Sequence, residues 1–273
     1  MQMTEQINDQ TVHHLQPLVT VAMPVFNGGQ FLRPAVLSII NQTFRNWELL
    51  IIDDGSTDNA IDTLADIKDD RIKIFRDSAN KGIAFRLNQA IDLAQGDFFA
   101  RIDSDDTSYP QRFELQLAAF KANSNLDLVA TRAEIIDAES KVTGQLPFVS
   151  SHKQICAKPW RGFYMPHPSW FGKLQWFKTH KYAIPAPYYC EDQELLLRAY
   201  KHSEFVCLNE TLIQYRSRNK INLVKSIKTR WALFKFQLKF FGFSQPVFSV
   251  FAIVLLVSRV IKDVFIKLVE TFK

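Results

Sequence analysis

The sequence predicts an α/β fold whose sheet is mostly parallel and doubly wound. Short, β-rich apolar runs alternate along the first hundred residues with segments in which apolar residues recur at helical spacing. A strand–helix alternation of this kind is typical of a parallel sheet that is covered by helices on both faces. The chain has 273 residues, 47% of them hydrophobic, which suffices for one large domain or for one domain with an appendage.

The first half of the chain divides into well-defined elements. The expected strands are Leu18–Phe26, Glu48–Ile52, Arg71–Phe75 and Asp97–Ile102, and the expected helices are Gln30–Gln42, Asp58–Ile67 and Gly82–Ala94. We expect Ser56 or Thr57 to cap the second of these helices. Ligands bind beyond the carboxyl ends of the strands in such sheets. Three segments should therefore meet at one edge, namely Pro24–Asn27, Asp53–Ser56 and Asp103–Asp106.

The second half of the chain is less regular. Its expected elements are a helix over Pro110–Asn123, a strand over Leu126–Thr131, an amphipathic helix over Glu191–His202 and a last short strand over Ile213–Arg216. Residues 140–190 are rich in aromatic residues and prolines and show no clear period.

Three carboxylates stand close together directly after the fourth expected strand. Alternate side chains of an extended chain share a face, so Asp103 and Asp105 point to the same side. Two oxygen ligands suit Mg²⁺ or Mn²⁺, which usually keep open positions for substrate phosphates. The alternative is an acidic turn, or a helix cap formed by Asp106 or Thr107. A calcium-binding EF-hand is not expected, because the glycine and the distal glutamate of that loop are missing.

Four segments of the chain, in this order, resemble the family 2 glycosyltransferases of the GT-A fold. They are the stretch from VTVAMPVFNGG to ELLIIDDGSTD, then NKGIAFRLNQAIDLAQGDFFARIDSDDTSYPQR, then MPHPSWF, and finally CEDQELLLRA. The resemblance extends from about Val19 to Arg216. It implies a Rossmann-like GT-A domain that transfers a sugar from a nucleotide-diphospho-sugar.

The resemblance assigns a set of residues to the donor nucleotide. Pro24–Asn27 and Asp54 would frame the base, and Asp53 could take the place of Asp54 because the two are adjacent. Arg86 would reach the nucleotide from the third helix, and Arg216 would contact the diphosphate. The full donor set is Pro24, Phe26, Asn27, Asp53, Asp54, Arg86, Asp103, Ser104 and Arg216.

The same resemblance assigns the metal to the carboxylate cluster. Asp105 would bind Mn²⁺ or Mg²⁺ directly, and the metal would bridge the two phosphates of the donor. Asp103 would be a second ligand, or would hold the ribose or a metal-bound water. Asp106 is expected to cap the helix that follows.

The resemblance also implies an inverting mechanism with one carboxylate base. Asp192 would deprotonate the acceptor hydroxyl as it attacks the anomeric carbon. Glu191 would support it, and His167 would lie near the acceptor and the phosphates. The alternative for the two acids is that they complement the dipole at the start of a helix.

The chain departs from the processive members of the family. It has no Q-x-x-R-W motif, since Ile227 stands where the glutamine of IKTRW would be, and no set of long spanning helices. Both features indicate the addition of a single sugar. UDP is the default donor nucleotide, because it is the commonest in the family.

The C-terminal part of the chain has a different character. After position 210 there are 12 Lys and Arg but two Asp and Glu, a net charge of +10, whereas residues 1–210 carry −5. Lys220–Phe243 mixes these cations with Leu, Trp and Phe at helical spacing, as in a helix that lies in a membrane interface. Val247–Ile261 is apolar but shorter than the ~20 residues that a span needs. An interfacial or re-entrant helix is the first interpretation, and a packed helical appendage is the alternative.

These features predict where the protein acts and on what. The polar start has no signal-like apolar segment, and the three cysteines suggest no disulfide framework or zinc site, so we expect a cytoplasmic protein. The tail would bind the anionic inner face of the membrane, and the acceptor would be a lipid-linked saccharide of bacterial surface polysaccharide synthesis. A nucleic-acid partner is not expected, because the basic strip is too apolar.

We therefore expect a polar N-terminal segment over residues 1–17, a catalytic domain over 18–216 and a membrane-associating helical region over 217–273. Two other functions remain open. A nucleotidyltransferase would need a basic, glycine-rich loop after the first strand, but no Lys or Arg precedes Arg33 there. A non-catalytic, membrane-bound nucleotide-sugar-binding module would not need Asp105 and Asp192.

Overall fold

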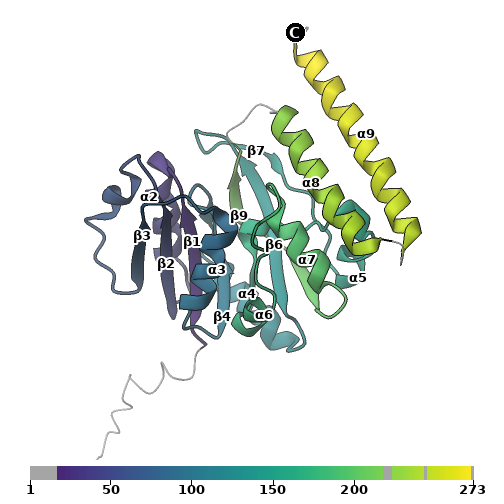
Figure 1. Ribbon diagram of the computed structural model, residues 1–273. Coiled ribbons are helices and arrows are strands. Elements are labelled where there is room, and N and C mark those ends of the chain that lie inside the picture. The colour runs from purple at the N-terminus through teal and green to yellow at the C-terminus, as the bar shows by residue number, and fades with distance from the viewer. Residues whose placement is uncertain (1–16, 218–222, 243–244, 272–273) are drawn as a thin grey trace, which may run out of the picture.

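The computed structural model describes residues 17–217, 223–242 and 245–271, and these residues contain one nine-stranded sheet (Figure 1). The strand order is β3-β2-β1-β4-β8-β6-β9-β5, and β7 pairs with β6. The strands are β1 (Val19–Val25), β2 (Trp47–Asp54), β3 (Ile72–Asp77), β4 (Phe98–Arg101), β5 (Thr107–Ser108), β6 (Leu128–Ile136), β7 (Val142–Gln145), β8 (Phe171–Lys173) and β9 (Phe205–Arg216).

Helices lie on both faces of this sheet. The α-helices are α2 (Leu32–Ile40), α3 (Ile83–Leu93), α4 (Arg112–Ala122), α5 (His152–Ile155), α6 (Leu174–Thr179), α7 (Glu191–Ala199), α8 (Leu223–Phe241) and α9 (Pro246–Thr271). Short 3₁₀ helices are η1 (Gly29–Phe31), η2 (Ala60–Leu64), η3 (Pro159–Arg161) and η4 (His167–Ser169).

The half of the sheet formed by β3, β2, β1 and β4 is parallel throughout, as the sequence predicts. Every residue of β1 and β2 is buried, which explains their continuous apolar runs. Leu50 packs in the same core cluster as Leu87 of α3, whereas Leu49 packs with Val36 of α2. Helices therefore cover both faces, and the doubly wound α/β prediction is confirmed.

The predicted α-helix over Asp58–Ile67 is wrong. In its place is the five-residue 3₁₀ helix η2, and Asn59 before it has a left-handed backbone with φ of 55°. Neither Ser56 nor Thr57 caps a helix, because both bond to Asn27 instead. A left-handed residue interrupts the helical path, so an α-helix cannot begin at Asp58.

Two strands of the second half are longer in the structure than the sequence predicts. The strand expected over Leu126–Thr131 is β6, and Ile213–Arg216 is only the end of the twelve-residue β9. These two strands pair in parallel over most of their length. The short strand β8 is antiparallel to both β4 and β6 and so joins the two halves of the sheet.

The C-terminal residues form a pair of helices that packs on the body of the protein, on the side away from β3 (Figure 1). Asp263 of α9 is buried and accepts two hydrogen bonds of 2.7 Å from Arg230 of α8. Phe241 is fully buried, and Trp160 stacks on Phe251 at 5.0 Å. The pair is therefore a packed appendage of the sheet domain.

Two earlier expectations fall partly outside the described residues. These are the polar segment at residues 1–16 and positions 220–222 and 243 of the expected tail helix. Among the helices that the structure describes, none has the length and apolarity to cross a bilayer.

Candidate active site

A cavity of about 1090 Å³ lies beyond the carboxyl ends of β1, β2 and β4. These strands are parallel neighbours, so the segments that follow them meet at one edge, as the sequence predicts. Most of the predicted donor and metal residues line this cavity, namely Pro24, Phe26, Asn27, Asp54, Arg86, Asp103, Ser104, Asp105 and Arg216. Asp53, His167, Glu191 and Asp192 are not in this lining.

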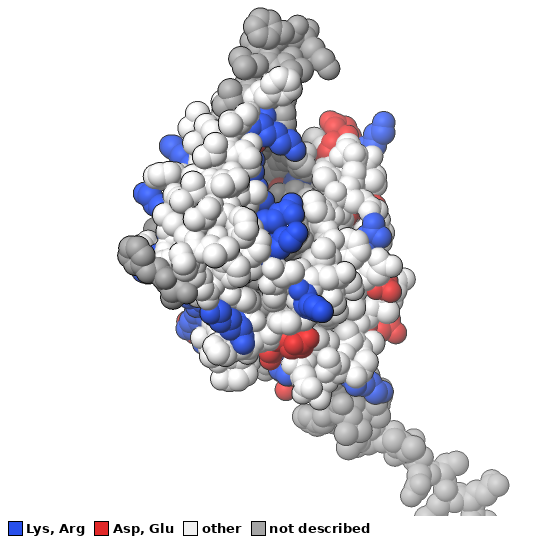
Figure 2. Space-filling model, turned by 90° about the vertical axis from the view of Figure 1, so that its right-hand side faces the viewer, with Lys and Arg blue, Asp and Glu red and all other residues white. Residues whose placement is uncertain are grey.

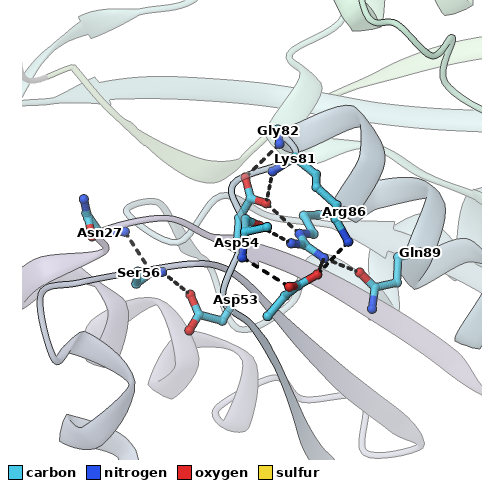
Figure 3. Close-up of polar contacts among 10 residues, drawn as sticks. Asn27, Asp53, Asp54, Ser56, Lys81, Gly82, Arg86 and Gln89 are labelled. Atoms are coloured by element: carbon cyan, nitrogen blue, oxygen red, sulfur yellow. Dashed lines mark hydrogen bonds and ion pairs between the residues drawn. The ribbon is translucent and has the colours of Figure 1, made fainter.

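Asp54, the last residue of β2, is bonded to the start of α3 (Figure 3). Its Oδ1 accepts from the Lys81 backbone N–H and from Arg86 Nε, both at 2.7 Å, and Oδ2 accepts from the Gly82 N–H at 2.9 Å. Arg86 is 1% exposed and also pairs with Asp77 at 3.0 Å. A carboxylate has about four acceptor positions, so Asp54 keeps one for a ligand.

Asp53 has a different place from its neighbour. Its Oδ1 accepts the Ser56 backbone N–H at 2.9 Å, and Ser56 Oγ accepts the Asn27 N–H at 3.0 Å (Figure 3). Asn27 has a positive φ of 53°, and its Oδ1 accepts from the Thr57 N–H. Asp53 thus holds the turns after β1 and β2 together, while Asp54 is the member of the pair that faces the cavity.

The positive group among the clustered carboxylates is Arg101, the last residue of β4. Its side chain is 1% exposed and binds both carboxylate oxygens of Asp103. Burial alone would lower the pKa of Arg101, but the charges of Asp103, Asp106 and Glu191 raise it. Arg101 is therefore a fixed cation between the D-x-D motif and the acids that begin α7.

Asp106 does not cap α4, and that expectation is wrong. Helix α4 begins after Gln111 without a side-chain cap. The Oδ1 of Asp106 accepts the Arg216 backbone N–H at 2.7 Å, so Asp106 connects the D-x-D loop to β9, while its buried Oδ2 has no hydrogen-bond partner in the described chain. Burial, together with the charges of Asp103 and Asp105, holds the pKa of Asp106 well above its usual range.

Arg216 fixes the same loop with its side chain. Its Nε donates to the Asp105 carbonyl at 2.9 Å, and its Nη2 donates to Ser140 Oγ at 3.0 Å. The guanidinium also lies 4.4 Å from the centre of the Phe31 ring. Arg216 thus anchors the D-x-D loop from β9 and borders the cavity.

The residues at this edge can hold a divalent cation only in partnership with a ligand. The side chains of the described residues include no cluster of three or more His, Cys, Asp or Glu that could hold a metal. Asp103 and Asp105 both line the cavity, although the Asp103 carboxylate already accepts a hydrogen bond from Arg101. One or two carboxylates completed by substrate phosphates is the usual arrangement for Mg²⁺, and Asp105 with Asp103 fits it.

A second group of titratable side chains surrounds the start of α7. Burial and the charge of Asp192 raise the pKa of Glu191 to about 7, and burial also raises the pKa of Asp192. Asp192 accepts a hydrogen bond of 2.9 Å from Gln193. The acids at this helix start are thus not simply solvated charges that complement the helix dipole.

His167 belongs to this second group. Its Nδ1 lies 3.8 Å from Glu191 Oε1, and its Nε2 shares a hydrogen bond of 2.8 Å with the Tyr182 hydroxyl. Burial and the charge of Arg101 hold the pKa of His167 well below its usual value, so the imidazole is neutral at physiological pH. Its two neighbours fix the orientation of the ring.

Comparison with protein families shows the family of the chain. Residues 20–181 match the model of the family described as glycosyl transferase family 2, which is more than half of the chain. The chain belongs to glycosyl transferase family 2.

Relatives of this glycosyltransferase are found among bacteria. A glycosyltransferase of Haemophilus influenzae is 36% identical over 141 residues, 51% of this chain and 55% of the relative. The Escherichia coli enzyme WfgD, a UDP-Glc:alpha-D-GlcNAc-diphosphoundecaprenol beta-1,3-glucosyltransferase, is 35% identical over 125 residues, 46% of this chain and 49% of the relative. These matches span about half the length of each relative.

The solved structure of S. aureus TarS 1-349 in complex with UDP has a similar fold. It superposes with a TM-score of 0.62 at 16% identity, over 81% of this chain and 65% of the TarS 1-349 chain. The GT-A fold predicted for this glycosyltransferase is thereby confirmed.

Sequence reasoning missed two parts of the site of this glycosyltransferase. Arg101 stands two positions before Asp103, and strand alternation alone could have placed both side chains on one face. The other part comes from the C-terminal helices, because Lys225 and Arg230 of α8 and Arg259 of α9 line the same cavity. No local pattern indicates that these cations turn toward the D-x-D motif.

Proposed function

We propose that this glycosyltransferase moves one sugar, with inversion, from a UDP-sugar to a hydroxyl of a lipid-linked saccharide in bacterial surface polysaccharide synthesis. The observation that carries the proposal is the cavity itself. Segments that follow β1, β2 and β4 and the end of β9 border it, and they include the D-x-D carboxylates.

The donor nucleotide would occupy the part of the cavity that Pro24–Asn27 and Asp54 form. The free acceptor position of Asp54 would receive an N–H of the base, while the hydrogen bond from Arg86 holds the carboxylate in its orientation. Arg86 therefore acts on the nucleotide through Asp54, since its own side chain is 1% exposed. Ser104 and Arg216 line the cavity beside the D-x-D motif, where the ribose and the diphosphate would lie.

Asp105, with Asp103, would hold Mn²⁺ or Mg²⁺ together with the donor phosphates. The bound metal supplies a positive charge that neutralises the leaving nucleoside diphosphate. Arg101 supports this arrangement, because it binds both oxygens of Asp103 and fixes that carboxylate. Arg216 Nε donates a hydrogen bond of 2.9 Å to the Asp105 carbonyl and so holds the D-x-D loop in place.

Asp192 would take the proton of the acceptor hydroxyl as that oxygen attacks the anomeric carbon. A general base is most effective when its pKa lies near the working pH, and burial raises the pKa of Asp192 toward that range. Glu191, with a pKa raised to about 7 by burial and by Asp192, would share the proton with its neighbour. His167, held by its hydrogen bond to the Tyr182 hydroxyl, would be a neutral polar group beside Glu191.

The acceptor would be presented at the inner face of a membrane. Exposed apolar side chains follow one face of α9 at positions Val250, Val254, Val257, Ile261 and Phe265. Another set, with Trp231 half exposed, lies on α8, whose exposed Lys residues would attract anionic lipid. The relative WfgD acts on a diphosphoundecaprenol-linked sugar, which supports the same class of acceptor here.

Donor turnover tests the proposal. The purified protein would be incubated with UDP-, GDP- and dTDP-sugars and a membrane lipid extract, with Mn²⁺ or with EDTA, and nucleoside diphosphate release would be followed. We expect release from one donor, lost with EDTA and lowered about 10²–10⁴-fold in Asp192→Asn. Asp66→Asn is a control for an aspartate outside the reaction, since Asp66 is 68% exposed and is not among the residues that line the cavity.

Each rival function gives its own result in this assay. A nucleotidyltransferase would release pyrophosphate from a nucleoside triphosphate and a sugar phosphate. A binding module would bind UDP without any turnover in the presence of lipid extract. Either result would contradict the proposed transfer.

A further inference from the structure

Three arginines gather where the C-terminal helices meet the cavity. Arg230 of α8 and Arg259 of α9 both line it. The Nη2 of Arg259 donates to the Arg161 carbonyl of η3 at 3.0 Å, which holds α9 to η3, although Arg161 itself is not among the lining residues. Figure 2 looks onto the side that carries α8 and α9, and Lys and Arg side chains lie around a hollow in this face.

The positive charge of these three arginines is only partly balanced by the described residues. Asp263 pairs with Arg230 at 2.7 Å, but within the described residues neither Arg161 nor Arg259 forms an ion pair. Burial lowers the pKa of Arg259, and the nearby charges of Arg230 and Arg161 lower it further, while Tyr164 raises it. Such a cluster favours a bound anion, and a guanidinium offers a planar fork that matches phosphate oxygens.

The position of Arg259 on its helix points to the source of the anion. Residues two apart on an α-helix differ by about 200°, so Arg259 faces the cavity while Val257 and Ile261 face away from it and are exposed. One stretch of α9 thus presents a cation to the site and apolar side chains to the outside. A ligand with a phosphate head group and a lipid chain suits this arrangement, because the phosphate would bind the cation and the chain would lie against the apolar side chains.

We propose that Arg259 and Arg230 in the cavity lining, with the positive charge of Arg161 close by, form a subsite for the diphosphate of the lipid-linked acceptor. This inference rests on the proposed function and adds to it the group through which the acceptor is recognised. The donor diphosphate has its own place at the D-x-D motif. The arginine subsite fixes the lipid-bound end of the acceptor, and its saccharide extends from there toward the donor.

Binding of a simple lipid diphosphate tests the subsite without any turnover. Farnesyl diphosphate and farnesol would be titrated into the detergent-solubilised full chain by calorimetry. We expect the diphosphate to bind more tightly than the alcohol. Arg259→Gln should weaken the binding of farnesyl diphosphate about 10- to 100-fold, which corresponds to the loss of one or two hydrogen bonds to a charged group. Arg161→Gln, at an exposed position, should weaken it less, and Arg259→Lys should give an intermediate loss.

Lys262→Gln is the matched control, because Lys262 is an exposed cation one turn further along α9 and outside the cavity lining. It removes the same charge from the same helix, and we expect no loss of affinity. An equal loss in both variants would mean general surface attraction and would overturn the subsite. So would a failure of the wild-type chain to bind farnesyl diphosphate.

A UDP titration separates the two possible sources of a diphosphate. We expect UDP affinity to be unchanged in Arg259→Gln. A loss of UDP affinity, with farnesyl diphosphate unaffected, would assign the arginines to the donor and overturn the proposal. The donor-turnover assay is independent of these titrations, so the subsite can fail while the proposed transfer stands.

Discussion

The buried pair of Asp54 and Arg86 allows a sharp test of how the nucleotide end of the cavity is held. Asp54 accepts three hydrogen bonds, and the two side chains are 5% and 1% exposed. Asp54→Asn keeps the shape of the side chain but removes its negative charge, and the new side-chain NH₂ group must face one of the N–H donors that now bind the carboxylate. Breaking a buried ion pair costs about 3–5 kcal/mol. Asp77 remains 3.0 Å from Arg86. We therefore expect Asp54→Asn to lower the free energy of unfolding by an amount near the lower end of this range, about 3 kcal/mol.

Urea unfolding followed by tryptophan fluorescence would measure this loss. Asp66→Asn is the matched control, since Asp66 also pairs with an arginine, Arg33 at 2.6 Å, but is 68% exposed. We expect no measurable change there, because exposed ion pairs contribute little. The double variant with Arg86→Gln should lose much less than the sum of the two single losses. If Asp54→Asn were as stable as Asp66→Asn, the pair would not hold α3 to β2 and the reasoning would be refuted.

Three further results are expected. Asp105→Asn should abolish the Mn²⁺ dependence of UDP binding, which calorimetry with and without EDTA would check; an unchanged metal effect would exclude Asp105 as a ligand. Glu191→Gln should make the free energy of unfolding depend less on pH, because burial and the charge of Asp192 raise the pKa of Glu191 from 4.5 to about 7 in the folded wild type. The folded wild type holds this proton more tightly, so its stability should fall by about 3 kcal/mol from pH 4.5 to pH 7 relative to the variant; parallel denaturation curves at pH 5 and pH 8 would contradict this. Val254→Glu with Ile261→Glu should remove binding to anionic vesicles in a flotation assay, and undiminished flotation would count against the apolar face of α9 as the docking surface.

The sequence indicates the parallel half of the sheet because each of its elements has a strong local signal. β1 and β2 are buried on both faces, so they consist of near-continuous apolar runs. Helix α3 repeats its apolar residues at helical spacing and begins after a glycine with φ of 86°. The expected helix at Asp58 failed because of contacts that are not local in sequence, since Ser56 and Thr57 bond to Asn27 some thirty residues away.

The D-x-D motif shows the limit of motif reading. Its residue types and spacing identify a candidate metal and donor site, and the structure puts Asp103 and Asp105 in one cavity. The motif does not reveal that Arg101 binds Asp103, or that Asp106 contacts β9 across 110 residues of sequence. Such contacts depend on which strands become neighbours.

The sequence by itself determined the α/β class, the order of the strands and helices in the parallel half of the sheet, and the types of residue that lie at the edge of that sheet. These follow from periodicity and residue type, which act over a few neighbouring positions. Only the tertiary structure decided that Arg101 lies between the two acidic motifs and that Arg230 and Arg259 complete the cavity. The physical reason is that the free energy of a buried charge depends on the groups packed around it, and these groups come from segments far apart in the chain.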